Sequence, residues 1–296
     1  MIDAELRAAA EALLNSHRPS QPASKIRSVK AVSGGCINNS QIIELETGQQ
    51  FFLKSNASAP RGMFETESKG LKLLGQSGAI KVPQVIGVGE TAKTDFLILE
   101  SICPEKPALD FSQRFGRQLA TLHRQTQTHF GLDHDNYLGA TLQPNQQHND
   151  WGVFWKQQRF GFQFQLAQER GYMDATFNKL SDRLLNRVDE LLKTNESPAL
   201  IHGDLWSGNF MVGPSGEPVL IDPAVYFADR EAEFGMTTLF GGFDQLFYDA
   251  YNEAWPLAAG AEQRIELYRL YHLLNHLNLF GSGYLNDCRA IMKKYS

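Results

Sequence analysis

Cysteine is scarce in this chain, and its three copies form no recognisable framework. Cys36, Cys103 and Cys288 are widely separated among 296 residues, and none belongs to a CxxC pair. A disulfide scaffold or a cysteine zinc site needs several cysteines at fixed spacings, so the sequence argues against both. Scattered cysteines are typical of proteins from reducing compartments, and we therefore expect a cytoplasmic protein.

Long hydrophobic runs and an excess of positive charge are also missing. No apolar run approaches the roughly 20 residues of a membrane-spanning helix, and the first residues lack the basic-then-apolar order of a signal peptide. The formal net charge is −5, which gives no reason to expect nucleic acid or an anionic membrane as a partner. Because nothing in the sequence marks an interface, we expect a monomer.

The composition is that of an ordinary globular protein, with 42% hydrophobic and 21% charged residues. Five segments early in the chain have the pattern of strands; they are 26–32, 41–46, 50–55, 82–89 and 94–100. Apolar residues at helical spacing predict helices near 2–14 and 63–76. Pro104 and Pro107 indicate a crossing between lobes, so we expect a first lobe at 1–102 and a second at 103–296.

The remainder of the chain has mainly helical patterns. Helices are expected after Asp110, which can cap the first of them, after Asp150, over 175–193, from Asp229 to Gly241-Gly242, and over 265–280. Residues 131–149 have the composition of a polar loop. Apolar runs at 210–212 and 219–221, joined by turn residues, predict a hairpin. The expected fold class is therefore α+β, with a small antiparallel β-sheet lobe and a larger, mainly helical lobe.

The stretch with the clearest chemistry runs from Leu200 to Tyr226. It contains His202-Gly203-Asp204, Asn209 and, after the hairpin, Asp222. Four residues separate Asp204 from Asn209, which is the spacing of the protein-kinase catalytic loop. There the Asp accepts a hydroxyl proton, and the Asn and a later Asp hold magnesium. The alternative is a simple turn followed by a residue that ends a strand.

A lysine and a glutamate upstream favour the kinase interpretation. Lys54 ends an apolar strand, the position at which kinases hold the α- and β-phosphates. Glu67 lies on the apolar face of the helix at 63–76, where a carboxylate needs a counter-charge, so we expect it to pair with Lys54. Glu65 is the second choice for this partner. Gly34 and Gly35 lie in a turn between strands that can approach phosphate oxygens.

Together these residues resemble the fructosamine kinase (ketosamine-3-kinase) family, in the aminoglycoside/choline kinase branch of the protein-kinase-like fold. The motifs that carry the resemblance are Gly34-Gly35-Cys36-Ile37-Asn38, Gln143-Pro144-Asn145, His202-Gly203-Asp204-Leu205-Trp206-Ser207-Gly208-Asn209, Ile221-Asp222-Pro223-Ala224 and Leu239-Phe240-Gly241-Gly242-Phe243. The resemblance covers nearly the whole chain, and the segment from Asp204 to Asn209 is its most specific part.

The resemblance implies that ATP phosphorylates the sugar 3-hydroxyl of a ketosamine, carried by a small amine or a glycated protein. The 3-phosphate makes the adduct unstable, so the amine is released. Asp204 would be the base. The remaining roles follow the family pattern: Asn209 and Asp222 for Mg²⁺, Lys54 with Glu67 and the Gly34-Gly35 turn for the phosphates, Glu100 and Ile102 for adenine at the hinge, and Trp206 as the wall for the cationic amine.

Several alternatives stay open at this point. The chain could phosphorylate another amino alcohol, such as choline or an aminoglycoside, or it could be a pseudokinase that only binds nucleotide. Asp229, Glu231 and Glu233 are interpreted as capping a helix. His272 and His276 are interpreted as pocket-lining or buried residues, because a metal site would need a third ligand. Cys36 is either a redox switch or a tolerated small residue, and we expect ATP to protect it from alkylation.

Overall fold

The computed structural model describes residues 2–32 and 37–296. Gly34, Gly35 and Cys36, which the sequence assigns to a phosphate-binding turn, lie outside the described residues. No helix in the described part of the chain is long and apolar enough to cross a membrane.

The first lobe is built on a five-stranded antiparallel sheet with the order β1-β2-β3-β5-β4, which confirms the sheet expected from the sequence. Its strands are β1 (Ile26–Ala31), β2 (Asn39–Leu45), β3 (Gln50–Asn56), β4 (Val85–Glu90) and β5 (Asp95–Glu100). In β3, Lys54 pairs with Leu97 of β5, so the lysine emerges from the middle of the sheet.

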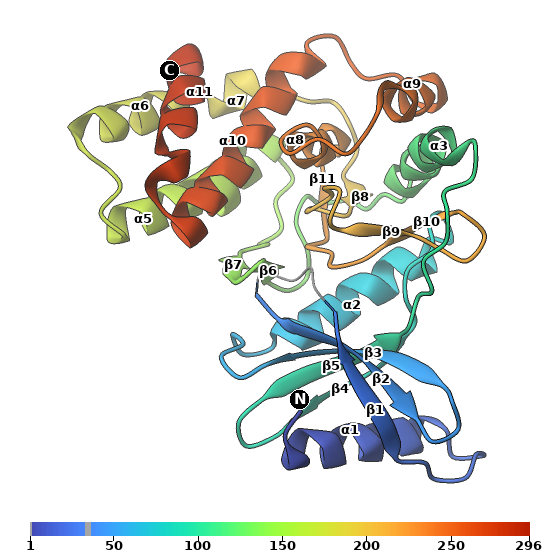
Figure 1. Cartoon of the computed structure of the whole chain (residues 1–296). Coiled ribbons are helices and arrows are strands. Elements are labelled where there is room, and N and C mark those ends of the chain that lie inside the picture. Colours follow the sequence, from blue (N-terminus) through green and yellow to red (C-terminus); the bar gives the residue numbers. More distant parts are fainter. Residues whose placement is uncertain (1, 33–36) are drawn as a thin grey trace.

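Two helices cover opposite faces of this sheet, α1 (Ala4–His17) and α2 (Met63–Gln76) (Figure 1). Strand β5 supplies both faces because successive side chains of a strand point in opposite directions. Phe96 and Ile98 belong to the hydrophobic cluster beneath α1, whereas Leu97 and Leu99 belong to the cluster with Phe64 of α2. The face under α2 is the one that positions Glu67 next to the sheet.

The second lobe is mainly helical and contains three short antiparallel strand pairs. Its helices are α3 (Phe111–His123), α4 (Trp151–Phe154), a π-helical segment (Trp155–Gly161), α5 (Phe162–Glu169), α6 (Ala175–Leu185), α7 (Val188–Leu191), α8 (Glu233–Thr237), α9 (Gln245–Ala254), α10 (Ala261–Phe280) and α11 (Leu285–Tyr295), with 3₁₀ turns at Arg230–Ala232 and Ser282–Tyr284. The pairs are β6 (Asn136–Leu138) with β7 (Thr141–Gln143), β9 (Phe210–Val212) with β10 (Pro218–Leu220), and β8 (Ala199–Ile201) with β11 (Tyr226–Ala228).

The largest hydrophobic cluster fills the second lobe and extends to Leu74 and Ile80 of the first. Residues 101–110, between β5 and α3, contain no helix or strand. This placement is compatible with the expected lobe boundary after residue 102, which stays a prediction. The β9–β10 hairpin and the helix after Asp150 are confirmed, although the latter includes the π-helical segment.

Two element predictions in the second lobe were wrong. Residues 131–149 are not a plain loop, since they contain the β6–β7 hairpin. The strand signal is hidden there because its inward-facing residues include the polar Asn136 and Gln143. The helix expected over 175–193 is broken into α6 and α7 at Asn186 and Arg187, where a poor helix former is followed by an arginine that bonds Tyr295 O.

Two predictions about helix starts were also wrong in part. Asp110 does occupy the N-cap position of α3, but its backbone (φ −103°, ψ 21°) is not extended, and its side chain makes no capping hydrogen bond. The helix expected from Asp229 to Gly241-Gly242 is a 3₁₀ turn followed by the short α8, which ends at Thr237. This segment is buried, and two of its acidic side chains, Glu231 and Glu233, bond to other parts of the lobe.

Candidate active site

An ion-pair cluster joins the two lobes at Lys54. Its ammonium lies 2.8 Å and 3.0 Å from the two carboxylate oxygens of Glu67 and 2.7 Å from Asp222 Oδ1. Glu67, and not Glu65, is therefore the partner of the lysine. Burial alone would lower the pKa of Lys54, but the carboxylates of Asp222 and Glu67 outweigh burial and raise it. Lys54 is a fixed cation in a buried position.

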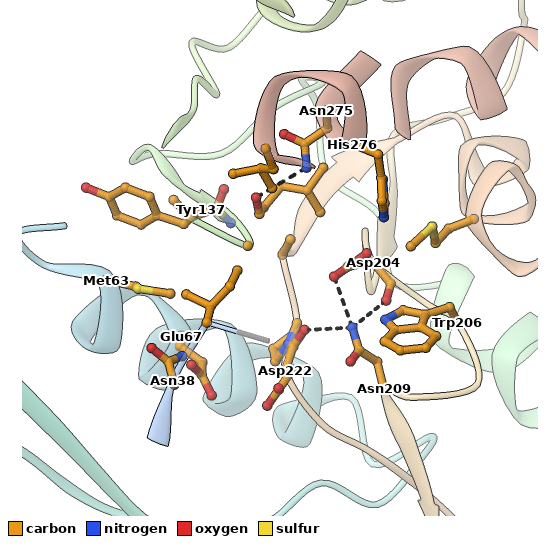
Figure 2. A pocket seen from close by; sticks show the side chains of 18 of the residues that line it. Asn38, Met63, Glu67, Tyr137, Asp204, Trp206, Asn209, Asp222, Asn275 and His276 are labelled. Atoms are coloured by element: carbon orange, nitrogen blue, oxygen red, sulfur yellow. Dashed lines mark hydrogen bonds between the residues drawn. The ribbon is translucent and has the colours of Figure 1, made fainter. Parts of the chain in front are cut away.

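The second cluster lies in the loop between β8 and β9. Asn209 Nδ2 donates to the backbone oxygen of Asp204 at 2.8 Å and to its Oδ2 at 3.0 Å. A longer contact of 3.5 Å reaches the backbone oxygen of Asp222 (Figure 2). Asp204, Asn209 and Asp222 thus converge at one end of the β9–β10 hairpin, as the sequence predicts. Because its nitrogen is turned toward Asp204, the amide oxygen of Asn209 points away from that residue.

Hydrogen bonds made by His202 and Glu233 fix the backbone of this loop. Backbone N–H groups of His202 and Gly203 donate to the Glu233 carboxylate at 2.6 Å and 3.0 Å. The Ile221 carbonyl can only accept, so His202 Nε2 donates to it at 2.8 Å, and Nδ1 accepts from Asp204 N at 3.2 Å. Burial lowers the pKa of His202, which keeps its ring neutral in this arrangement.

The backbone is tightly constrained at two positions of the site. Gly203 has φ +83°, and a Cβ atom there would lie 2.1 Å from Ala224 O, so no other residue fits. Asp222 has φ 53° and is the non-glycine residue with positive φ in the described part of the chain. A non-glycine residue in this region is strained, and such strain clusters at functional sites.

The environment of Asp204 raises the affinity of its carboxylate for a proton. Burial raises the pKa of this carboxyl well above its usual range, and the nearby negative charges of Asp222 and Glu233 act in the same direction. The hydrogen bond from Asn209 acts in the opposite direction but is outweighed. A carboxylate with a raised pKa is a stronger base than an exposed one.

These residues open into a cavity of about 450 Å³ lined by both lobes. The first lobe contributes Asn38, Lys54, Met63 and Glu67, and the second contributes Asp204, Trp206, Asn209, Asp222, Tyr137, Asn275 and His276 (Figure 2). Trp206 lines the same cavity as Asp204, and its role as the wall for the substrate amine stays a prediction. Glu100 and Ile102 are not among the lining residues, and their expected contact with adenine stays a prediction.

Aromatic side chains form one side of the cavity. His276 lies 5.0 Å from the ring of Phe240, 5.4 Å from Phe280 and 5.2 Å from Tyr284. All four residues line the cavity, and Phe240 and Phe280 are about half exposed. The Nδ1 of His276 bonds the carbonyl of His272 at 2.7 Å, so its other ring nitrogen is an acceptor. The interpretation of His276 as a pocket residue is confirmed.

Sequence reasoning missed the roles of two acids in the 229–233 segment. Asp229 does cap the 3₁₀ turn by accepting from Glu231 N at 2.9 Å. Glu231, however, forms a two-point ion pair with Arg264 at 2.6 Å and 2.9 Å, and Glu233 braces the loop described above. The burial of both side chains is the reason, because a buried carboxylate needs partners from other elements. Their alternation with apolar residues was the available signal.

The fructosamine kinase family model matches residues 9–296 of this chain. The chain belongs to the fructosamine kinase family. Curated relatives of this family member include a probable ketoamine kinase of Vibrio vulnificus, 42% identical over 89% of this chain and 90% of the relative. The chloroplastic protein-ribulosamine 3-kinase of Arabidopsis thaliana is 37% identical over 92% of this chain and 84% of the relative.

Solved structures of the same family superpose over nearly the whole chain. A protein of Haemophilus somnus, provisionally named a fructosamine-3-kinase, has a TM-score of 0.88 and 29% identity, with 97% of each chain covered. A second, from Thermobifida fusca, has a TM-score of 0.84 and 32% identity, with 96% of each covered. An aminoglycoside phosphotransferase at 14% identity and a TM-score of 0.62 covers 96% of this chain and 97% of its own, and shares the fold. The fold of this fructosamine kinase is thus protein-kinase-like, as expected.

Proposed function

We propose that this fructosamine kinase uses ATP and Mg²⁺ to phosphorylate the 3-hydroxyl of ketosamines on free amines or proteins. Family membership makes the chain a phosphotransferase with an alcohol acceptor. Its relatives named ketoamine kinase and protein-ribulosamine 3-kinase, at 42% and 37% identity, support a ketosamine as the acceptor. The observation that carries the proposal is the 2.7 Å ion pair between Lys54 and Asp222, which brings both lobes to one cavity.

Asp204 is assigned as the base. Asn209 bonds Oδ2 of Asp204, so we assign proton transfer to Oδ1. The substrate 3-hydroxyl forms its new bond to the γ-phosphorus while the bond from that phosphorus to the β-phosphate oxygen breaks. The hydroxyl proton passes to Asp204, and ADP leaves with the electron pair of the broken bond. The raised pKa of Asp204 makes it a better acceptor for this proton.

The donor set present fits magnesium. Asp222 offers a carboxylate that is 43% exposed toward the cavity, and Asn209 offers an amide oxygen turned away from Asp204. Magnesium prefers such hard oxygens, completed by phosphate oxygens and water. When bound, it neutralises charge on the transferring phosphoryl group. Lys54, fixed between Glu67 and Asp222, adds a second positive charge at the same place.

The amine of a ketosamine is cationic at neutral pH, and we assign its recognition to the aromatic rings that line the cavity. Trp206 lines the cavity beside Asp204, and Phe240 packs 6.3 Å from the Trp206 ring. Aromatic faces attract cations without the desolvation of an added carboxylate. This arrangement supports an amine-bearing sugar over a plain sugar. The monomeric state and the cytoplasmic location stay predictions.

An ATP-consumption assay with Mg²⁺ tests the proposal on four acceptors: a ribulosamine, a fructosamine, choline and an aminoglycoside. The Asp204→Asn variant is the blank, since it keeps the size of the side chain and removes the base. We expect turnover on the ketosamines that falls by about 10²–10⁴-fold in the variant. Turnover on choline or the aminoglycoside alone would overturn the acceptor assignment. Nucleotide binding without turnover on any acceptor would indicate a pseudokinase.

A further inference from the structure

The backbone that follows Asp222 is held by two side-chain amides of the β6–β7 hairpin. Gln143 Nε2 donates to Ala224 O at 3.0 Å, and Asn136 Nδ2 donates to Val225 O at 2.8 Å. Both amide side chains are buried, at 0% and 3% exposure. Backbone carbonyls only accept hydrogen bonds, so the amide nitrogens must face them.

Further hydrogen bonds fix the two amides themselves. Asn136 Oδ1 accepts from Gln143 and from Asn145, both at 2.8 Å. Gln143 Oε1 accepts from the Tyr271 hydroxyl at 2.9 Å. Asn145 Oδ1 in turn accepts from an Arg159 guanidinium nitrogen at 2.8 Å. A continuous network of hydrogen bonds therefore leads from the Arg159 guanidinium to the backbone that follows Asp222. Every side chain in this network is buried.

Arg159 carries the charge at the far end of this network. Its side chain is fully buried, and its guanidinium also bonds Pro144 O at 2.6 Å. The rings of Tyr226 and Phe154 lie 4.0 Å and 4.7 Å from its central carbon. None of the ion pairs in the described part of the chain includes Arg159. A buried cation bonded to an amide polarises it and strengthens the next bond.

The network acts on a strained position. With φ 53°, Asp222 lies in the left-handed region that non-glycine residues seldom occupy, and such a conformation persists where the surroundings fix it. The bonds to Ala224 and Val225 fix the chain two and three residues later. The same hairpin reaches the first lobe, because the Tyr137 hydroxyl donates to Arg61 O at 2.9 Å.

We propose that Gln143 and Asn136 are positioning residues for Asp222. They hold the backbone after Asp222 so that its carboxylate is presented to the metal and to Lys54 at one fixed place. This inference rests on the proposed function, which makes Asp222 a magnesium ligand. The predicted consequence is selective: loss of either amide weakens Mg²⁺ binding and lowers kcat, while the ketosamine KM stays near its original value.

The first test compares Gln143→Met with Gln163→Met. Gln163 is also a buried amide, but its side chain bonds Asn275 and Asn278 and not the backbone of residues 222–225. Calorimetric titration of Mg²⁺ into enzyme saturated with AMP-PNP measures metal affinity without turnover. We expect Gln143→Met to weaken Mg²⁺ binding by about 10-fold or more, as loss of outer partners of metal ligands does. Gln163→Met should leave it unchanged within error.

Asn136→Asp is the second variant, and it keeps the size of the side chain and both acceptor functions. It removes the donor to Val225 O and adds negative charge near the metal. Added negative charge alone would tighten Mg²⁺ binding, so weaker binding would have to arise through the backbone. Wild-type Mg²⁺ affinity and kcat in both Gln143→Met and Asn136→Asp would overturn the inference, whatever their melting temperatures.

Asp222→Asn separates this inference from the proposed function. If Asp222→Asn binds Mg²⁺ as the wild type does, the proposed metal ligand is wrong and the positioning role is lost with it. If Asp222→Asn weakens Mg²⁺ binding and the hairpin variants do not, only the positioning role is wrong. Weakening in all three variants supports both.

Discussion

The Glu233 carboxylate accepts a hydrogen bond from the His202 backbone N–H at 2.6 Å, and both residues are buried. Its second oxygen accepts from the next N–H, that of Gly203, at 3.0 Å. One buried side chain thus satisfies two neighbouring backbone donors and fixes the direction in which Asp204 leaves the loop. His123 Nε2 lies 3.6 Å away, and burial lowers the pKa of His123, so the Glu233 charge is stabilised mainly by these N–H groups.

Glu233→Gln should therefore lower both stability and kcat. Glutamine offers one acceptor oxygen, so one backbone N–H loses its partner, at a cost of about 1–3 kcal/mol. Urea unfolding and steady-state kinetics measure the two effects. Glu253→Gln is the matched control, because Glu253 pairs with Arg117 at the surface, where the two side chains are 70% and 54% exposed. A Glu233→Gln enzyme with the stability and kcat of the control would contradict the bracing role.

The contribution of the Lys54–Glu67 pair to protein stability can be measured separately from its contribution to catalysis. Lys54→Met leaves the Glu67 carboxylate buried without its partner, which typically costs about 3–5 kcal/mol. The double variant Lys54→Met with Glu67→Leu should recover most of this loss, because two apolar side chains replace the pair. Phosphoryl transfer should be lost in both variants, since the phosphates lose their cation. Chemical denaturation measures the free energy of unfolding, and an ATP-consumption assay measures phosphoryl transfer. A double variant that is no more stable than Lys54→Met would contradict the argument.

Gly203→Ala should be far more harmful than the same change at Gly48. The two glycines have nearly the same backbone angle, φ +83° and +84°, so each alanine carries a left-handed penalty of about 1–2 kcal/mol. At Gly48 a Cβ atom meets nothing within 4 Å, whereas at Gly203 it overlaps Ala224 O. We expect Gly48→Ala to keep full kcat and Gly203→Ala to lose it. Equal melting temperatures for the two variants would show that the loop can move aside.

Asp229 should make the protein less stable as the pH rises from about 4 to about 6. Burial raises its pKa to about 6 from its ordinary value of 3.8, and the Glu231 charge acts in the same direction. The folded state therefore keeps a proton that the unfolded state releases, and the stability present below the unfolded pKa is lost as pH rises through the folded pKa.

Asp229→Asn tests this prediction because asparagine keeps the acceptor that caps Glu231 N. Free energies of unfolding in urea should agree between variant and wild type at pH 4. At pH 7 the variant should be more stable by up to about 3 kcal/mol, since each unit of pKa shift is worth about 1.4 kcal/mol. A difference that does not change between these two pH values would rule out the linkage.

The parts of the fold that sequence patterns predicted are those whose buried residues are apolar. Strand β5 is an example, because Phe96 to Leu99 are all buried against one helix or the other. The Lys54–Glu67 pair was predictable for a related reason: a charge on an apolar helix face requires a partner. The convergence of Asp204, Asn209 and Asp222 followed from a short hairpin between them.

The features that sequence patterns missed depend on buried polar groups and on backbone geometry. Asn136 and Gln143 are inside, yet their side chains give no hydrophobic alternation from which a strand could be recognised. Glu233 bonds two backbone N–H groups. Every residue except proline carries such a donor, so the sequence does not show which N–H groups a buried glutamate will bond. The left-handed backbone of Asp222 likewise occurs without a glycine that would indicate it in the sequence.

The ion pair between Lys54 and Asp222 forms only when both ends of a long segment have been synthesised. Its two residues are 168 positions apart, so the contact closes a loop of more than half the chain. Contacts of such long range form late in folding, and during synthesis the earlier lobe emerges and folds first. We therefore expect the sheet that carries Lys54 to leave the ribosome before the carboxylate of Asp222 does. Nascent chains should stay unable to transfer phosphate until the second lobe has folded against that sheet.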